Sequence, residues 1–375
     1  MDAAKTLYTA ERLAAVRDAT AAAGMDALVI TPGAELRYLT GYDAHASERL
    51  TALLVPANGP ATLIVPRLER PLAASSPLPG TGASMVDFGD GTDPYALLAS
   101  LLDEHADGPR RVIGAAERMW AAHWHGIEGA IPGASLAMAG DVLSPLRMIK
   151  SAAEIAELAR AAEAIDRVHA RMGEWLRPGR TEREVAADIS AAIIAEGHTA
   201  VSFAIVAAGP NGASPHHHVS DHVIERGQPV VVDIGGTVDT GYGSDCTRTY
   251  CVGQPPADFT EYYGALHAAH RAGVDAVRPG VTAASVDAAT RAVLTDAGYG
   301  EYFTHRTGHG IGLDGHEAPY IVDGDDTVLV PGMAFSIEPG VYIPGRHGAR
   351  IEDIVVCTDT GVTRLDTLPT EVTIL

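Results

Sequence analysis

The stretch PVVVDIGGTVDTGYGSDCTRTYCV, residues 229–252, decides the fold of the carboxyl-terminal part of this chain. Two runs rich in β-branched residues flank a turn near Asp239, which is the pattern of an antiparallel hairpin. Such a hairpin brings Asp233 and Asp245 side by side although they stand twelve residues apart. Two neighbouring carboxylates repel, and one takes up a proton unless a cation neutralises both. The hairpin therefore predicts a divalent metal site.

Three further glycine-rich frames hold side chains of the same kind. His309 lies in HRTGHGIGLDGHEAPY, Glu338 in FSIEPGVY and Glu352 in GARIEDIV. Each residue alone is explained as a cap or an exposed strand position, but their joint occurrence with Asp233 and Asp245 is not. Four carboxylates and one imidazole suit Mn²⁺, Co²⁺, Fe²⁺ or Zn²⁺. In two-metal hydrolases the ions lie roughly 3.5 to 4 Å apart and share a water, which is the expected nucleophile.

Length, composition and charge limit the class of protein. A chain of 375 residues predicts two domains. No run reaches the roughly 18 to 20 apolar residues of a membrane span, and no signal peptide is visible, so a cytoplasmic protein is expected. Three cysteines cannot all pair, which favours free buried thiols in a reducing compartment. A net charge of −21 argues against nucleic acid as a partner, because a phosphate backbone requires a basic surface.

The first part of the chain, residues 6–145, alternates helical and strand-like segments and predicts an α/β layer domain. An amphipathic helix ends at Gly24, and the apolar runs TALLVP and ATLIVP indicate a hairpin. His123 and His125 are interpreted as helix-surface residues rather than ligands. No catalytic residue types cluster in this part.

A change of pattern marks the domain boundary near residue 145. Ser151 and Glu154 form a capping box at the start of a long amphipathic helix, which predicts domains 1–145 and 146–375. A second helix with its own capping box starts near Thr181 and ends at Gly197.

The tripeptide Arg-Pro-Gly occurs twice, at 177–179 and 278–280. Each copy stands between a long helical segment and a helix that begins within three residues. The match is short, but it raises the possibility of two related halves.

Histidines near the metal frames extend the candidate site. The tract at 216–218 is interpreted as part of a strand, in which at most two of three consecutive side chains serve one site. His305 and His316 bracket His309 at minus four and plus seven. The glycines of GHGIG, 308–312, are interpreted as allowing the backbone to approach metals and substrate, since no P-loop lysine or helix follows.

With these residues the chain resembles the pita-bread metallopeptidases, which comprise methionine aminopeptidase, aminopeptidase P, prolidase and the non-metal relative creatinase. The resemblance covers essentially the whole chain, with about 150 to 375 similar to the catalytic domain. It implies a mixed α/β fold, in which a creatinase-like amino-terminal α/β domain precedes a pita-bread catalytic domain. Methionine aminopeptidases generally lack the first domain, so the proline-specific branch is favoured.

The resemblance implies a role for each metal-site residue. Asp233 would bind one metal, and His309 and Glu338 would bind the other. Asp245 and Glu352 would bridge the two ions.

Further positions match residues around the metals in that family. Thr247 matches a residue that is not itself a ligand but hydrogen-bonds near the bridging water, and Arg350 matches an arginine two positions before the last ligand. His216 matches a histidine that contacts substrate, and His305 and His316 match those on either side of the metal-binding histidine. The implied catalytic residues are His216, His305, His316 and Glu338. The implied substrate-binding residues are His216, His316, Arg350 and Tyr320.

Two positions depart from the family pattern. The two Asp ligands usually stand eleven residues apart, so the turn near Asp239 is expected to take up one more residue, with a bulge as the proposed means. Archaeal-type prolidases commonly carry an arginine four residues after the second histidine, where this chain has Tyr320. Arg306, Arg346 or the histidines are the alternatives for binding the terminal carboxylate of a dipeptide.

The leading hypothesis is a metal-dependent exopeptidase that cleaves Xaa-Pro bonds of short peptides, as a dipeptidase or an aminopeptidase. His316 or His216 would donate to the developing oxyanion, and Glu338 would pass a proton to the leaving imide nitrogen. Two divalent ions per subunit are expected, Mn²⁺ first and Co²⁺, Zn²⁺ or Fe²⁺ as alternatives. A homodimer without membrane contact is expected. The alternatives are a creatinase-like hydrolase or lyase for a small metabolite and a non-catalytic peptide-binding module.

Overall fold

The chain divides between Arg147 and Met148 into two units. The computed structural model describes residues 4–105 and 111–375. No helix in these ranges is long and apolar enough to cross a membrane. All three cysteines are buried and free, as their number and spacing predicted.

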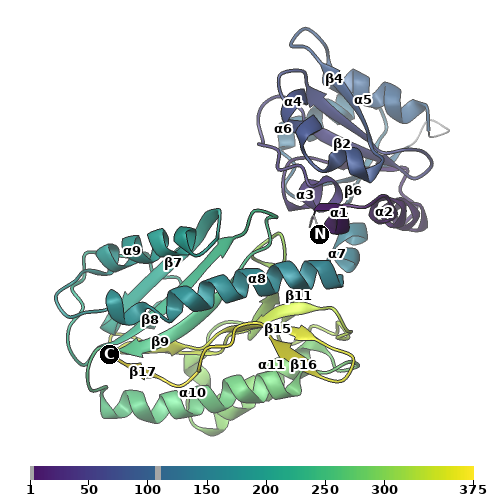
Figure 1. Cartoon of the computed structure of the whole chain (residues 1–375). Helices are drawn as coiled ribbons and strands as arrows, with labels where there is room; N and C mark the ends of the chain where they lie inside the picture. Colours follow the sequence, from purple (N-terminus) through teal and green to yellow (C-terminus); the bar gives the residue numbers. More distant parts are fainter. Residues whose placement is uncertain (1–3, 106–110) are drawn as a thin grey trace. The chain divides into compact units, whose positions relative to one another are not determined.

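A six-stranded mixed sheet forms the centre of the first unit, in the order β4-β3-β2-β1-β5-β6 (Figure 1). Its strands are β1 (Ala27–Ile30), β2 (Ala52–Pro56), β3 (Thr62–Pro66), β4 (Ser84–Phe88), β5 (Val112–Ala115) and β6 (Ser135–Met138). Its helices are α1 (Ala4–Leu7), α2 (Ala10–Ala22), α3 (Ala34–Thr40), α4 (Arg70–Ser75), α5 (Pro94–Asp103), α6 (Ala121–Ala130) and α7 (Gly140–Met148), with the 3-10 turn η1 (Leu78–Thr81). The predicted α/β class is confirmed, and β2 and β3 form the expected antiparallel hairpin.

His123 corrects one expectation for this unit. This residue is only 5% exposed. Its Nδ1 lies 3.0 Å from Tyr95 Oη, and its Nε2 lies 3.0 Å from Ser47 O. The helix-surface interpretation is therefore wrong for His123, because both polar atoms find partners inside the fold. It is confirmed for His125, whose side chain is 89% exposed.

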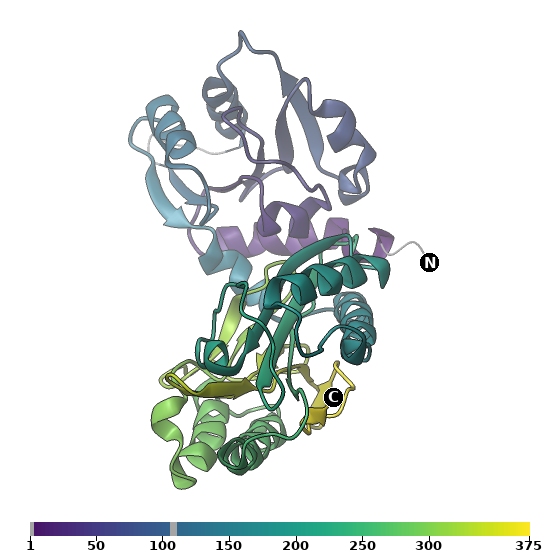
Figure 2. The ribbon, with the colours of Figure 1, turned by 90° about the vertical axis from the view of Figure 1, so that its left-hand side faces the viewer.

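Two helix pairs and two sheets build the second unit (Figures 1 and 2). One sheet has the order β17-β9-β8-β7 and the other β11-β10-β12-β15-β16, while β13 and β14 form a separate hairpin. The strands are β7 (Ala200–Ala208), β8 (Pro229–Thr237), β9 (Cys246–Cys251), β10 (Gly308–Gly310), β11 (Glu317–Ile321), β12 (Ala334–Ile337), β13 (Gly340–Ile343), β14 (His347–Arg350), β15 (Asp353–Cys357), β16 (Val362–Arg364) and β17 (Thr373–Ile374). The helices are α8 (Ala152–His169), α9 (Glu182–Ala195), α10 (Ala257–Ala276) and α11 (Ala283–Asp296), with 3-10 turns η2 (Met172–Glu174), η3 (Gly209–Ala213) and η4 (Gly300–Tyr302).

The helices cover the outer faces of these sheets. The apolar faces of α8 and α9 share one core with β7, β8 and β9. Helices α10 and α11 pack against the second sheet and the β13–β14 hairpin. Both capping boxes that the sequence indicated are present, at the starts of α8 and α9. Each of these helices is stabilised mainly by the burial of one apolar face, rather than by the helix propensity of its residues.

The two Arg-Pro-Gly copies occupy equivalent places in the second unit. Gly179 N donates to Ile224 O at 2.9 Å, and Gly280 N donates to Leu329 O at 2.9 Å. Both glycines have positive φ angles, +91° and +88°, which explains why glycine ends each tripeptide. The N-cap threonines that follow form matching β-bridges, Thr181 with Val223 and Thr282 with Val328. Shared hydrogen bonds at both places support two related halves.

Strands β8 and β9 pair in one unbroken register that ends with Thr237 opposite Gly243. The paired strands therefore contain no bulge near Asp239, so the proposed bulge there is wrong. A register shift occurs instead on the other edge of β8, between Val201 and Phe203 of β7. The ladder between β8 and β9 is thus continuous from the strand that bears Asp233 to the turn.

The glycines of the GHGIG frame serve the sheet. A Cβ atom on Gly308 would lie 1.8 Å from Ser336 O of β12, and one on Gly310 would lie 2.3 Å from Ala318 O of β11. Neighbouring strands, rather than metals or substrate, thus require glycine at these two positions. The earlier interpretation of these two glycines is corrected accordingly.

We expect Gly308→Ala to destabilise the protein by about 1–3 kcal/mol, because the added methyl group overlaps strand backbone that cannot move aside. The urea midpoint of unfolding measures this. Gly315→Ala is the matched control in the following loop, where an added Cβ meets no atom within 4 Å. Equal midpoints for the two variants would contradict the expected role of Gly308.

Candidate metal centre

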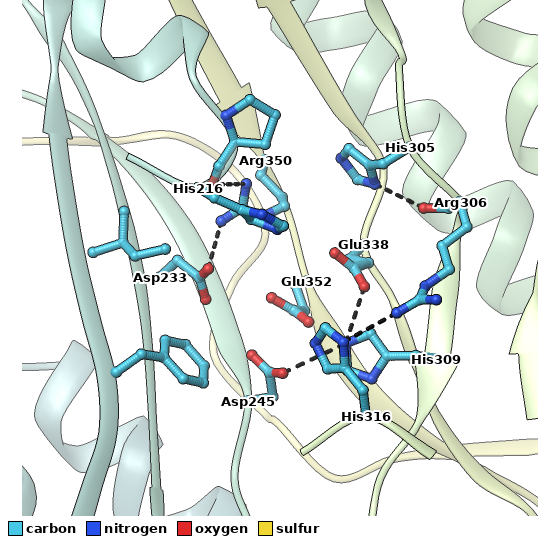
Figure 3. A pocket seen from close by; sticks show the side chains of 13 residues that line it. His216, Asp233, Asp245, His305, Arg306, His309, His316, Glu338, Arg350 and Glu352 are labelled. Atoms are coloured by element: carbon cyan, nitrogen blue, oxygen red, sulfur yellow. Dashed lines mark hydrogen bonds and ion pairs between the residues drawn. The ribbon is translucent and has the colours of Figure 1, made fainter. Parts of the chain in front are cut away.

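The five side chains that the sequence singled out as ligands lie in one cavity of about 460 Å³ (Figure 3). Asp233 comes from β8, Asp245 immediately precedes β9, and His309 lies in β10. Glu338 directly follows β12, and Glu352 lies between β14 and β15. Four of the five residues are buried, and the side chain of Glu338 is 14% exposed. Two sheets thus contribute to one polar centre.

The ligand atoms form overlapping groups. Each group has its candidate ligand atoms within 4.8 Å of one another: Asp233, Asp245 and Glu352; His309, Glu338 and Glu352; Asp245, His309 and His316. Glu352, Asp245 and His309 each belong to two groups. Shared carboxylates between two adjacent groups are the arrangement that a pair of metal ions needs.

The charge on this cluster calls for a cation. Burial, followed by the charges of neighbouring carboxylates, raises the pKa of Asp245 and of Glu352 well above the usual carboxyl range. Burial also raises the pKa of Asp233, against the opposing charge of Arg350. Asp233 Oδ1 is buried without a hydrogen-bond partner. An unpartnered carboxylate oxygen within an acidic cluster fits a divalent metal ion.

His309 and Glu338 form the less acidic side of the cluster. His309 Nδ1 lies 3.1 Å from Gly310 O, so this nitrogen carries a proton, and Nε2 lies 3.2 Å from Glu338 Oε1. Burial alone would raise the pKa of Glu338, but the hydrogen bond and charge of His309 outweigh it and lower that pKa to about 2. The same contact raises the pKa of His309 against the effect of burial. The tautomer leaves Nε2 directed toward the carboxylates.

A layer of hydrogen bonds orients these ligands. Thr247 Oγ1 donates to Glu352 Oε2 at 2.6 Å and accepts from Arg350 Nε at 3.1 Å. Arg350 Nη2 donates to Asp233 Oδ2 at 2.5 Å, and Nη1 donates to Tyr342 Oη at 2.9 Å. The buried guanidinium of Arg350 therefore donates its hydrogen bonds to acceptors of the protein itself, which positions Asp233 and Thr247.

The histidine tract lies in a turn after η3 rather than in a strand, so the alternation argument does not apply to it. His216 lines the cavity (Figure 3). His217 instead contacts the buried Glu182, with Nε2 and Oε2 2.7 Å apart, and His218 is exposed. One histidine of the three faces the site.

His305 and His316 both line the cavity. His305 Nε2 lies 2.9 Å from Tyr342 Oη, and burial lowers the pKa of this histidine. The ring of His316 lies 3.7 Å from that of His309, centroid to centroid. Burial, then the charges of His309 and Arg306, lower the pKa of His316 to about 4. Its imidazole is therefore neutral near pH 7.

Tyr320 does not line the cavity, and its residue is 36% exposed. Its ring lies beneath the guanidinium of Arg306, 4.5 Å from the carbon at the centre of that group. Arg306 lines the cavity. The tyrosine thus reaches the site through Arg306.

Several residues at the site were missed in the sequence. Ser336 Oγ accepts from His309 N at 2.9 Å and donates to Glu338 Oε1 at 3.0 Å, so one hydroxyl links two ligands. Ser336 stands two residues before Glu338, and this period-two spacing along an extended chain was an available signal. The cavity also has an apolar wall, which consists of Phe203, Ile205 and Pro215. Ile205 pairs opposite Asp233, a contact that the sequence does not reveal.

Comparison with known proteins agrees with this geometry. Metallopeptidase family M24 matches residues 156–359, and the Creatinase/Prolidase N-terminal domain matches residues 12–149. The chain is 52% identical over 366 residues to the probable dipeptidase PepE of Mycobacterium bovis, covering 98% of this chain and 96% of that protein. It is 35% identical over 341 residues to an Xaa-Pro dipeptidase of Lactobacillus delbrueckii subsp. lactis, covering 90% and 92%. The crystal structure of dipeptidase PepE from Mycobacterium ulcerans superposes with a TM-score of 0.93 at 54% identity, covering 100% of this chain and 99% of that one.

A creatinase-type domain followed by a pita-bread domain with an acidic, histidine-containing centre defines a metal-dependent peptidase. The chain belongs to metallopeptidase family M24. The family, the fold and the enzyme class inferred from the sequence are confirmed.

We expect Glu352→Gln to raise the urea midpoint of metal-free, EDTA-treated protein at about pH 8. The pKa of Glu352 is raised in the folded protein. Such a group stabilises the folded state at pH values below its pKa in the unfolded state, and this stabilisation is lost as the pH rises through its pKa in the folded state. Glutamine removes that penalty while keeping an acceptor for Thr247. The gain should disappear at about pH 4, where the unfolded-state carboxyl is also largely protonated.

Glu338→Gln is the matched variant with the opposite sign. The pKa of the wild-type Glu338 carboxyl is lowered to about 2 in the folded protein. This carboxyl therefore stabilises the folded state at pH values above its pKa in the unfolded state, and the stabilisation is lost as the pH falls through its pKa in the folded state. This variant should lower the midpoint at about pH 8. A stabilised Glu338→Gln protein, or a destabilised Glu352→Gln protein, would contradict these assignments.

Proposed function

We propose that the protein is a two-metal exopeptidase that hydrolyses Xaa-Pro bonds of short peptides. The observation that carries the proposal is the pair of overlapping ligand groups that share Glu352. The complete set of four carboxylates and His309 does not favour the creatinase-like alternative or a non-catalytic binding module. Relatives named Xaa-Pro dipeptidase support the substrate class.

Five residues would hold the ions: Asp233, Asp245, His309, Glu338 and Glu352. We assign Asp233 to one ion, His309 and Glu338 to the other, and the remaining two carboxylates to both. Bound divalent ions would supply a Lewis acid that lowers the pKa of a coordinated water and polarises the scissile carbonyl. Thr247 and Arg350 would keep Glu352 and Asp233 oriented.

The cavity histidines and Glu338 would handle the remaining charge and protons. Arg306 Nη2 donates to His316 Nδ1 at 3.1 Å, so the neutral His316 carries its proton on Nε2. This N–H would donate to the developing oxyanion, and His216 would contact the substrate at the cavity wall. Glu338, which is ionised at neutral pH, would accept the proton of the attacking water and pass it to the proline nitrogen. His305 would position Tyr342 and, through it, Arg350.

The apolar wall supports proline specificity. Phe203, Ile205 and Pro215 face the same cavity as the ligands. A rigid proline ring buries apolar surface there without losing rotational freedom. A tertiary amide nitrogen also leaves poorly until it is protonated, which the role of Glu338 addresses.

Native ion, assembly and compartment form part of the same proposal. Mn²⁺ suits a donor set dominated by carboxylate oxygens. A homodimer is supported by the edge strand β6, where Leu136 is 50% and Met138 is 39% exposed, because an apolar edge strand favours pairing with another chain. Three free thiols support a reducing, cytoplasmic environment. Light scattering with chromatography tests the dimer.

We expect Mn²⁺-loaded protein to hydrolyse Ala-Pro and EDTA to abolish the activity. Asp245→Ala should remove it too, because the variant loses a carboxylate that we assign to both ions. Asp239→Ala, in the turn of the same hairpin, is the matched control and should retain activity, since the Asp239 side chain is 71% exposed and pairs with the exposed Arg160. Absence of metal-stimulated cleavage across a panel of Xaa-Pro dipeptides and tripeptides would refute the proposal.

We expect His316→Ala to lower kcat for Ala-Pro about 10²- to 10³-fold, as for the loss of one oxyanion donor. The metal content, measured by elemental analysis, should remain at two ions per chain. A loss of metal in parallel with activity would instead identify His316 as a ligand, in line with the third ligand group.

A further inference from the structure

Arg306 stands apart from the other arginine that lines the cavity. Arg350 is bound to Asp233, whereas Arg306 forms no ion pair with a carboxylate anywhere in residues 4–105 and 111–375. Its two contacts are a hydrogen bond from Nη2 to His316 Nδ1 and the face of the Tyr320 ring. A permanent positive charge therefore lies on the wall of an acidic cavity without an anionic partner.

These two contacts hold the guanidinium while leaving donors free. The aromatic face attracts the cation and covers one side of its plane. His316 takes one of the two hydrogens of Nη2, so Nε, Nη1 and the second Nη2 hydrogen remain available, and one two-donor edge of the group stays free. Two parallel N–H groups match the two oxygens of a carboxylate. The site is built for a planar anion that the protein itself does not supply.

The position of Arg306 relative to the ligands limits which anion this is. Arg306 contacts His316, whose ring lies against His309, so the guanidinium is one side chain removed from the metal ligands. The residue after a scissile bond lies one Cα–Cα step of about 3.8 Å from the residue before it. In a dipeptide that second residue bears the terminal carboxylate, whereas in a longer peptide it bears a neutral amide.

We infer that Arg306, held in place by Tyr320 and His316, binds the C-terminal carboxylate of a dipeptide and thereby makes the protein a dipeptidase. This inference rests on the proposed Xaa-Pro cleavage. It assigns Tyr320 a positioning role, in which an aromatic ring presents an arginine located fourteen residues earlier in the chain.

The test compares Ala-Pro with its C-terminal amide, Ala-Pro-NH₂, and with Ala-Pro-Ala. Wild-type protein should show a KM for Ala-Pro about 10- to 100-fold below that for the amide, as expected for a charge-assisted hydrogen bond. Arg306→Ala should raise the KM for Ala-Pro by the same factor and leave the KM for the amide unchanged, whereas any loss of kcat through the released His316 should be equal for the two substrates. Arg306→Lys should recover part of the loss, because the charge returns without the planar fork.

Two control variants separate recognition of the carboxylate from general damage. Arg346→Ala removes an exposed arginine that pairs with Asp258 outside the cavity, and it should keep the wild-type ratio of KM values. Tyr320→Phe should also keep it, because the ring remains beneath Arg306, whereas Tyr320→Ala should reduce the preference. Metal content and thermal midpoints confirm that each variant is folded and loaded.

Two outcomes would overturn the inference. An Arg306→Ala protein that keeps the wild-type ratio of KM values and loses kcat equally on the acid and the amide would show that Arg306 acts only by orienting His316. Equal KM values of the wild-type protein for Ala-Pro and Ala-Pro-NH₂ would show that the carboxylate is not recognised. Calorimetric binding of proline and prolinamide to the Mn²⁺-loaded protein gives a readout without turnover. Tighter binding of proline than of prolinamide, lost in Arg306→Ala, supports carboxylate binding by Arg306. This result would stand even if the protein failed to hydrolyse Xaa-Pro substrates, and that failure would refute only the proposed function.

Discussion

The mutual repulsion of four carboxylates in one buried cavity is the constraint on which the rest of the second unit depends. Protein groups offset only part of it, because Arg350 neutralises Asp233, His309 pairs with Glu338, and Thr247 hydrogen-bonds Glu352. Asp245 and Glu352 retain raised pKa values, first through burial and then through their neighbours. Packing must hold these groups together until cations replace the missing charge. The surrounding strands are accordingly buried and paired on both sides.

The joint between the two sheets is the place where this constraint is met. Glu352 N donates to Thr247 O at 3.1 Å, and the two residues form an isolated antiparallel bridge between β9 and the segment before β15. The same two side chains share the hydrogen bond that orients the carboxylate. Backbone and side-chain contacts at one point thus connect the hairpin that bears Asp233 with the sheet that bears His309. The cavity histidines and Arg306 surround this joint.

The clustering of the five candidate ligands was predictable because each of them sits in a short frame whose turn chemistry and charge are local. The Asp233–Asp245 hairpin needed only alternation and a glycine-rich turn. Contacts between distant strands were not predictable in the same way. Ser336 and Ile205 owe their places at the site to pairing across sheets, and His123 is buried because Tyr95 and Ser47, remote in sequence, satisfy its ring. The glycines of β10 were recognised as special, but the neighbouring backbone that requires them was not visible.

The matching hydrogen bonds around the two Arg-Pro-Gly tripeptides have a consequence for how the candidate ligands are distributed. Each tripeptide leads into the second helix of a pair, α9 or α11, and each helix pair packs against its own sheet. The first sheet bears the aspartate hairpin, whereas the second bears His309 and Glu338. Neither half alone holds all five candidate ligands, so the two-ion centre exists only where the two halves meet.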